Sequence, residues 1–442
     1  MSLKAPSLLR AVTLCLATLC PYAAHAQQVM LDEEFTRDAT ILTAPLRSSL
    51  APQISVHFVL INDPTINAFV TPENIVYVHT GLIAKANSAA ELQGVLAHEL
   101  GHVAAQHLFQ QEVQQRQAAM GAIAGAVVGL GAAVAGAPQA GTALMMGSQA
   151  GAIQSILAHT RTQESEADRH AVNALHTAGL SAQGMVEMFT TLRTESQLSY
   201  DAPPPWLVTH PLPPDRLANL QQVVSAEAPA LRTGLLKTDQ SIDYPRLQAK
   251  VAALTGTIGS ILRKYNGADD VSRYARALAY ARQGKMDFAV SNLNPLLKAH
   301  PDDPFYNELA AKMALDRGDL GGAHAILAKM VKLNPDAIMF QYELAEVMRN
   351  QNDYDDAVPY YERVSRSWPQ WSDPWLSLGL CYGNLGKITE SHLARAQGFL
   401  VAPDLEAARQ SLALARGYLR KTPNPAATEW ANAIQSHLDN LK

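Results

Sequence analysis

Two histidines four residues apart are the part of the sequence with the clearest capacity for chemistry. His98 and His102 stand in the segment LAHELGHV, residues 96–103. Residues four apart on a helix lie on one face, so the two imidazoles can bind one metal ion. Glu99 is rotated by about 100° from His98, where its carboxylate can reach a water on that ion without binding the ion itself. The spacing therefore predicts a zinc site in which Glu99 accepts a proton from that water.

A third ligand must come from another element, because a catalytic zinc ion normally keeps three protein ligands and one open position. The best candidates are Glu164 and Asp168, which are four residues apart on a polar helix predicted over residues 153–178. Glu166, between them, points elsewhere. Either carboxylate can bind the ion while the other orients a histidine ring or donates a proton. Spacing does not choose between these two assignments.

The histidine motif lies on a helix that is predicted to begin at Ser88. Ser88 with Glu91 three residues later is a capping-box pattern, typical of a helix N-terminus. Two β-branched runs, residues 54–61 and 75–79, precede it and predict a small sheet. Apolar residues continue the helix at helical spacing: Leu92, Val95, Leu96, Leu100 and Val103.

The motif and the acidic segment together resemble peptidase family M48, the family of the CAAX prenyl proteases and the HtpX-type heat-shock proteases. LAHELGHV is followed about sixty residues later by E-x-E-A-D, and the similarity spans about residues 56–216. Shorter segments agree with the same family: Asn67-Ala68-Phe69, Gly81-Leu82 and His107.

This resemblance implies roles that the spacing leaves open. It implies three zinc ligands: His98, His102 and Glu164. Glu99 would be the general base, and Asp168 the second carboxylate, which is often assigned as the proton donor. His170 departs from the family pattern and receives no role, because a histidine on a polar helix face is usually solvated.

A proline-dense segment over residues 198–216 is predicted to be a loop, and it holds a further candidate. His210-Pro211, with Arg216 six residues after the histidine, matches a family element. Folded across the zinc, His210 can donate a hydrogen bond to the oxyanion of the reaction. Alternatively, it can occupy the open coordination position and keep the enzyme latent. Two more histidines are expected at the surface or behind the ligands: His79 and His107.

The C-terminal part of the chain repeats every 34 residues. Turn residues keep this interval at Gly284, Gly318, Asn352 and Gly386, and prolines keep it at Pro301, Pro335, Pro369 and Pro403. A unit of this length with small residues in both helices and a terminal proline resembles the tetratricopeptide repeat. Such units stack into a solenoid with a concave groove for a peptide or protein. Units are predicted to begin near Asp270, Pro304, Ile338 and Ser372, with a further pair of helices and a cap beyond Asp404.

Charge and the N-terminal segment limit the function and the compartment. The 442 residues carry 35 basic and 40 acidic side chains, a net charge of −5, which argues against binding nucleic acid by phosphate neutralisation. Residues 1–26 are predicted to be a cleaved signal peptide that ends in Ala24-His25-Ala26. A lipid anchor is disfavoured, because Cys15 and Cys20 each follow a leucine. The mature chain keeps only Cys381, so it can form no internal disulfide.

Residues 117–160 contain no Lys, Arg, Asp or Glu, and the first half of this segment is rich in glycine and alanine. That half has about the length of a membrane span, but small residues carry little transfer energy. Two interpretations stay open. The segment is a pair of close-packed buried or lid helices, or it contacts the membrane peripherally or plugs a cleft.

These features predict a mainly α (α+β) protein, with a zincin-type metalloprotease domain and its small sheet followed by an α-solenoid. The predicted division is a signal peptide at 1–26, the metallopeptidase domain at 27–240, a connecting helical segment at 241–269 and the repeat domain with its cap at 270–442. A secretory signal combined with such repeats is similar to the periplasmic β-barrel assembly-enhancing protease group of Gram-negative bacteria.

The function predicted on this basis is that of an exported, periplasmic endopeptidase with one zinc ion per subunit. Its expected substrates are unfolded or misassembled envelope proteins, and the resemblance adds outer-membrane β-barrel precursors. The repeats are expected to bind the substrate or the β-barrel assembly machinery. The alternative is a chaperone or adaptor that acts mainly through the repeats and has latent protease activity.

Overall fold

The computed structural model describes residues 28–50, 52–107, 161–198, 203–228, 231 and 242–440. The predicted signal peptide and the uncharged segment 117–160 lie outside these residues. Within them the chain is mainly helical with one small sheet, as predicted. None of the helices in the described part combines the length and the apolar character needed to cross a membrane.

The strands form one four-stranded sheet in the described part of the chain, in the order β1-β2-β4-β3. Its strands are β1 (Gln28–Met30), β2 (His57–Asn62), β3 (Ala68–Val70) and β4 (Ile75–His79). β2 and β4 are parallel, while β1 and β3 pair antiparallel with their neighbours. β2 and β4 correspond to the two runs predicted from the sequence.

Helix α2 (Glu33–Leu50) was not predicted from the sequence. Four of its apolar side chains recur at helical spacing and are fully buried: Phe35, Ala39, Leu42 and Leu46. Pro45 inside the helix and several threonines obscure this pattern, because both residue types disfavour helix on their own. Burial of the apolar face outweighs these weak local preferences.

Helix α4 (Ala89–Ala104) carries the histidine motif through the middle of the N-terminal domain. It begins as predicted, since the Ser88 side chain accepts a hydrogen bond from the Glu91 N–H at 3.2 Å. Gly101 lets the helix through residues 161–177 come very close. A Cβ at this position would lie 2.5 Å from the carbonyl oxygen of Ala167. Glycine here therefore brings the acidic segment onto the histidines.

The proline-dense segment contains a short helix, α8 (Pro205–Thr209), so the prediction of a loop throughout was wrong. Proline is well tolerated in the first turn of a helix, where its missing N–H costs no hydrogen bond. The turn buries Trp206 completely and ends at His210. Helix α9 (Pro214–Ser225) follows directly. The described residues of the domain also include α3 (Thr80–Lys85) and α7 (Gln183–Leu198).

The repeat array has the predicted register. The first helix of each of the four units begins at the predicted residue, and the further pair of helices beyond Asp404 is present. Gly284, Gly318 and Gly386 have φ of +69° to +76°, and Asn352 has +67°. Each unit therefore turns between its helices through a left-handed residue, which glycine and asparagine adopt most readily. The helices are α13 (Asp270–Arg282), α14 (Met286–Ala299), α15 (Pro304–Asp316), α16 (Leu320–Leu333), α17 (Ile338–Asn350), α18 (Tyr354–Ser367), α19 (Ser372–Asn384), α20 (Ile388–Val401), α21 (Leu405–Leu419) and α22 (Pro425–Asn440).

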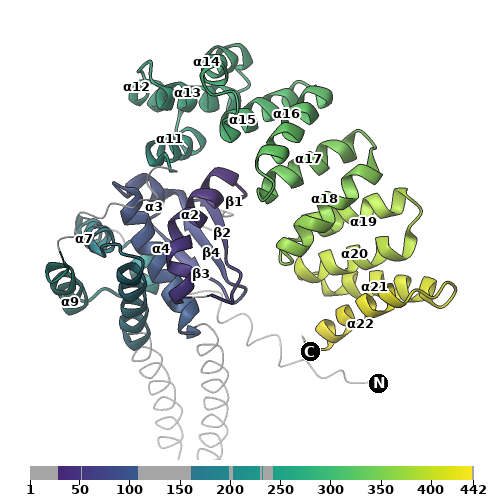
Figure 1. The fold of residues 1–442 in the computed structure, drawn as a ribbon, viewed down its shortest axis with the longest axis horizontal. Coiled ribbons are helices and arrows are strands. Elements are labelled where there is room, and N and C mark those ends of the chain that lie inside the picture. The colour runs from purple at the N-terminus through teal and green to yellow at the C-terminus, as the bar shows by residue number, and fades with distance from the viewer. Residues whose placement is uncertain are drawn as a thin grey trace, which may run out of the picture.

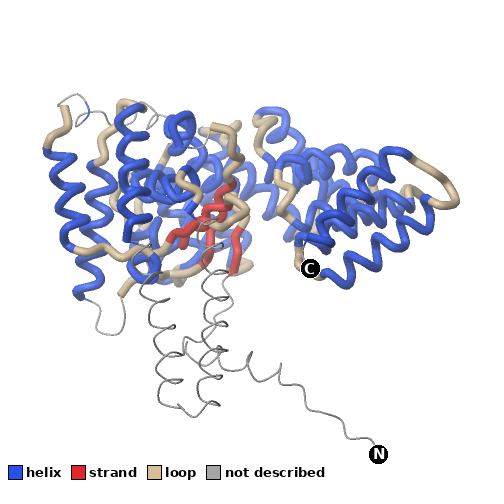
Figure 2. The backbone as a smooth tube through the Cα atoms, turned by 90° about the horizontal axis from the view of Figure 1, so that it is seen from below, coloured by secondary structure: helices blue, strands red, loops and turns tan. Residues whose placement is uncertain are grey.

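Helix α11 (Tyr244–Thr255), followed by α12 (Ile258–Lys264), joins the two parts of the molecule. Leu247 and Val251 of α11 belong to the apolar core of the N-terminal domain, whereas Ala249 and Ala253 belong to that of the repeats. The array then curves as an arc with the N-terminal domain on its inner side (Figure 1). The strands lie between the helices of their own domain and the array (Figure 2).

The inner side of the arc is packed against the sheet. Met339, Trp368 and Trp371 of the third repeat and its following turn form an apolar cluster with Val59 and Ile75. The His57 and Trp368 rings stack with their centroids 4.7 Å apart. The N-terminal domain thus fills part of the groove that the sequence predicted for a partner.

A buried ionic cluster lies beside this apolar contact. The Nζ atom of Lys250 on α11 lies 2.7 Å from Asp32, 3.3 Å from Glu34 and 3.5 Å from Glu308 of the second repeat. Burial alone would lower the pKa of Lys250, but the carboxylates of Asp32 and Glu308 raise it well above its ordinary value. The lysine therefore stays charged and links both parts of the chain.

Candidate metal centre

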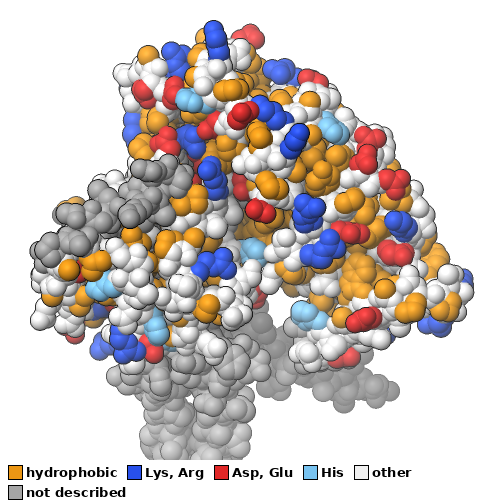
Figure 3. Space-filling model, viewed as in Figure 1, with side chains coloured by type: hydrophobic (Ala, Val, Ile, Leu, Met, Phe, Trp, Pro, Cys, Tyr) orange, Lys and Arg blue, Asp and Glu red, His pale blue; other side chains and the backbone are white. Residues whose placement is uncertain are grey.

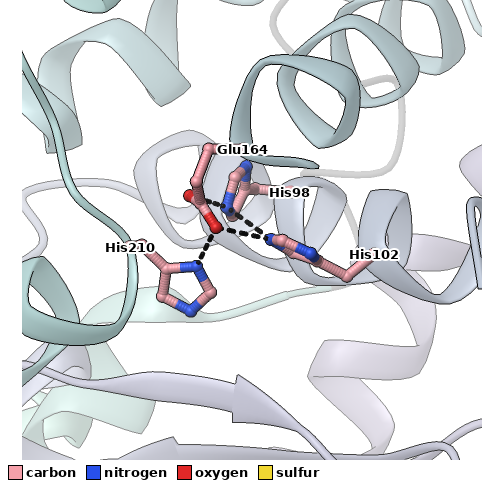
Figure 4. A group of neighbouring side chains, drawn as sticks. All are labelled: His98, His102, Glu164 and His210. Carbon is pink, nitrogen blue, oxygen red and sulfur yellow. Dashed lines mark hydrogen bonds and ion pairs between the residues drawn. The ribbon is translucent and has the colours of Figure 1, made fainter. Parts of the chain in front are cut away.

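The side chains of His98 and His102 lie side by side on α4, as their spacing predicts. Their Nε2 atoms are 3.2 Å apart. Glu164 faces them from the helix through residues 161–177, with Oε2 3.4 Å from Nε2 of His98 and Oε1 3.3 Å from Nε2 of His102. His210 completes the group, with its Nδ1 3.0 Å from Oε1 of Glu164 (Figure 4). One ligand atom from each of the four buried residues lies within 4.8 Å of all the others.

This donor set fits a divalent zinc ion. Three imidazoles and one carboxylate are ligands that zinc takes readily, and a group of this size can surround one ion. Burial lowers the pKa of His102 to about 4, so its imidazole is in the neutral form that binds metals. Burial would raise the pKa of Glu164, but hydrogen bonds from His102, His210 and His98 hold it well below the ordinary value.

Asp168 lies behind His98 rather than inside the group. Its Oδ1 is 2.9 Å from Nδ1 of His98. Arg216 donates to both oxygens of Asp168 and, through Nη1, to Oε2 of Glu164 at 2.8 Å. Burial would lower the pKa of His98, but the hydrogen bonds with Asp168 and Glu164 raise it to about 9, so metal binding must displace a proton there. Spacing allowed three roles for Asp168: metal ligand, orientation of a histidine ring, or proton donor. Its position behind His98 favours orienting the histidine ring.

Glu99 is fully buried beside the group. Its Oε1 accepts a hydrogen bond from Nε1 of Trp206 at 3.2 Å and lies 3.7 Å from Nε2 of His210. Its Oε2 has no hydrogen-bond partner among the described residues. A buried carboxylate oxygen without a partner is costly, and such an atom is common where a protein performs chemistry. An oxygen without a partner in the protein can accept a hydrogen bond from a water.

Sequence reasoning missed Trp206 and gave Arg216 no role. Trp206 holds Glu99, and its ring stacks on His210 with centroids 4.8 Å apart. A tryptophan four residues before His210 in an otherwise proline-rich segment was the available signal. Arg216 was noted as part of the element that begins with His210-Pro211, but its partners are 48 and 52 residues away along the chain, so its role was not predicted.

The remaining acidic and histidine candidates lie outside the group of four. Glu166 and His170 are partly exposed, and 3.9 Å separates them. His79 is buried in the sheet, where its Nδ1 lies 2.9 Å from the Thr65 hydroxyl. His107 is buried directly behind His102, with the two Nδ1 atoms 2.9 Å apart.

The fold and this site define a metalloprotease with a helical repeat domain. The model of peptidase family M48 matches residues 27–224, and a tetratricopeptide repeat model matches residues 340–370. The chain belongs to family M48, and it is 31% identical to a Vibrio cholerae protein over 77% of this chain and 71% of that protein.

The names of the relatives describe related activities. The Vibrio cholerae protein is named "Putative beta-barrel assembly-enhancing protease". An Escherichia coli K12 protein named "Beta-barrel assembly-enhancing protease" is 28% identical over 82% of this chain and 75% of its own length. "Metalloprotease YcaL" of the same strain is 33% identical over 32% of this chain and 54% of its own length.

Proposed function

We propose that this protein is an exported zinc endopeptidase that cleaves unfolded or misassembled β-barrel proteins of the bacterial envelope. The observation that carries the proposal is the convergence of His98, His102 and Glu164 beside the buried carboxylate of Glu99. The names of the relatives support the substrate class. The predicted signal peptide at residues 1–26 supports a periplasmic location.

The side chains divide the chemistry among them. A zinc ion held by His98, His102 and Glu164 would polarise the scissile carbonyl and lower the pKa of a water. Glu99 accepts the proton of the attacking water at its unpartnered oxygen, while Trp206 fixes the other oxygen. Asp168 holds the ring of His98 in place, and Arg216 clamps Asp168 and Glu164 together. The residues that meet substrate are thus preorganised before it binds.

For His210 we propose the latent role of the two that the sequence left open. Its Nδ1 hydrogen-bonds the same oxygen of Glu164 that faces His102, so it lies where a fourth ligand would lie. Water and substrate would then have to displace it. Burial of Trp206 under the same turn keeps His210 in this position.

His210→Ala is therefore expected to raise cleavage of casein and of the protein itself. If the closed arrangement holds about nine-tenths of the molecules, opening the site raises the rate about tenfold. Fragments are counted by gel densitometry against wild type and against His170→Ala, a partly exposed histidine outside the group. Loss of cleavage in His210→Ala would show that the histidine supports the reaction instead.

The repeats are proposed to recruit the protein substrate or the β-barrel assembly machinery. The inner side of the third repeat is occupied by the sheet, so a partner would use the remaining surface. Hydrophobic side chains gather along the array on the face seen in Figure 3. Exposed large apolar side chains of the later helices include Leu380, Ile388, Leu414 and Tyr418.

Metal removal tests the enzymatic proposal directly. After treatment with a chelator, cleavage of an unfolded outer-membrane β-barrel protein is expected to stop, and added zinc is expected to restore it. Fragment yield is measured together with the melting temperature, so that unfolding is recognised. Undiminished cleavage by protein that metal analysis shows to be free of zinc would refute the proposed mechanism.

A further inference from the structure

A row of hydrogen-bonding side chains leads from His102 away from the group of four. Nδ1 of His107 lies 2.9 Å from Nδ1 of His102. On its other side, Nε2 of His107 lies 3.3 Å from Oε2 of Glu166. His107 is fully buried, whereas the side chain of Glu166 is 38% exposed. The row therefore connects a candidate metal ligand with the protein surface.

The chemistry of the row determines where its protons lie. Nε2 of His102 faces His98 and Glu164, which is the ligand side of the ring. With Nε2 acting as the ligand atom, the proton of His102 is on Nδ1 and is donated to Nδ1 of His107. His107 then carries its proton on Nε2 and donates it to the Glu166 carboxylate. With these two tautomers, both the contact between His102 and His107 and the contact between His107 and Glu166 are hydrogen bonds.

The backbone is shaped to bring His107 into this position. Helix α4 ends at Ala104, and the next turn passes through Gln106 with φ of +54°. A left-handed conformation is unfavourable for a residue with a side chain. The turn folds the chain back so that a residue five positions after His102 reaches its ring.

From these contacts we infer that His107 is a positioning residue for the metal site, acting through His102 and anchored by Glu166. His98 has the equivalent support from Asp168, at 2.9 Å from its Nδ1. Each histidine of the motif is thus oriented from behind by its own partner, one by a carboxylate directly and the other through a second imidazole. Such partners fix the tautomer and the direction of a ligand. The inference rests on the proposed role of His98, His102 and Glu164 as metal ligands.

Two substitutions at His107 separate positioning from simple filling of the core. Leucine at this position fills space but accepts no hydrogen bond. Asparagine is smaller, yet its Oδ1 can accept from His102 and its amide can donate to Glu166. His107→Leu is expected to weaken zinc binding by about 10–100-fold, the usual effect of losing such a partner. His107→Asn is expected to retain the affinity within about threefold.

The measurement is zinc affinity of the full chain, by competition with a chromophoric chelator. The absorption spectrum of the cobalt(II)-loaded protein reports the ligand geometry independently of activity. His79→Leu is the matched control, because His79 is equally buried but lies in the sheet outside the row. This control is expected to keep the wild-type affinity and spectrum.

The outcomes distinguish the inference from the proposed function. Unchanged zinc affinity and cobalt spectrum in His107→Leu would overturn the inference, and so would an equal loss in His107→Asn and His107→Leu. A wild-type chain that binds no zinc would overturn the proposed function instead. Should His107→Leu fail to fold, Glu166→Leu decides at the exposed end of the row. The zinc affinity of Glu166→Leu is expected to fall, by less than about 100-fold. An unchanged zinc affinity would contradict the inference.

Discussion

Replacing Glu99 by glutamine is expected to lower the rate of peptide-bond cleavage by about 10²–10⁴-fold, the usual contribution of a general base. Glutamine has the size of glutamate but cannot accept a proton from water. Its carbonyl oxygen can still accept the hydrogen bond from Trp206, which in wild type spans 3.2 Å. Fold and metal content should therefore be retained, and only the chemical step should be lost.

Cleavage of an unfolded substrate, zinc content and melting temperature are measured in parallel for Glu99→Gln and wild type. Equal cleavage by the two proteins would exclude Glu99 as the base. The same variant tests the adaptor alternative in cells. If Glu99→Gln supports envelope assembly as well as wild type, the repeats carry the main function and proteolysis is secondary.

Replacing Glu164 by glutamine is expected to remove most of the bound zinc, whereas the same change at Glu166 should leave it nearly intact. The two oxygens of Glu164 lie 3.3–3.4 Å from Nε2 of His102 and of His98. A neutral amide oxygen is a much poorer zinc ligand than a carboxylate. Loss of a ligand should lower the zinc affinity at least tenfold, because even loss of a hydrogen-bond partner behind a ligand lowers it by about that much.

Glu166→Gln is a matched control, because it makes the same chemical change two residues away on the same helix. A glutamine there can still accept the hydrogen bond from His107, so the row behind His102 is preserved. Zinc per chain is measured by metal analysis after dialysis. A larger loss in Glu166→Gln than in Glu164→Gln would mean that the ligand has been assigned wrongly.

The sequence predicts those features of the structure that depend only on residues close together in the chain. A spacing of four places His98 and His102 on one helix face whatever surrounds them, and their Nε2 atoms indeed lie 3.2 Å apart. The 34-residue interval is local in the same sense, because each unit contacts mainly its neighbours. Both predictions therefore needed no knowledge of the tertiary structure.

Contacts between distant segments could not be obtained in this way. Glu164 and Asp168 share a face, and which of them meets the imidazoles depends on how their helix packs on α4, to which Gly101 lets it come close. The positions of Arg216 and Trp206 depend on how the segment after residue 203 folds over α4. Helix α2 was missed for a related reason, since its stability comes from burial rather than from its own residue preferences.

The array contacts the N-terminal domain at two places, at α11 and at the third repeat, and this limits how many repeats can lie between them. Solenoids usually gain or lose whole units, because each unit contacts only its neighbours. Here α11 anchors one end of the array, and Met339 and Trp368 must reach Val59 at a set distance along it. An extra unit inserted before Ile338 would carry these side chains past the sheet. The number of repeats between the two anchors is therefore dictated by the size of the domain that they enclose.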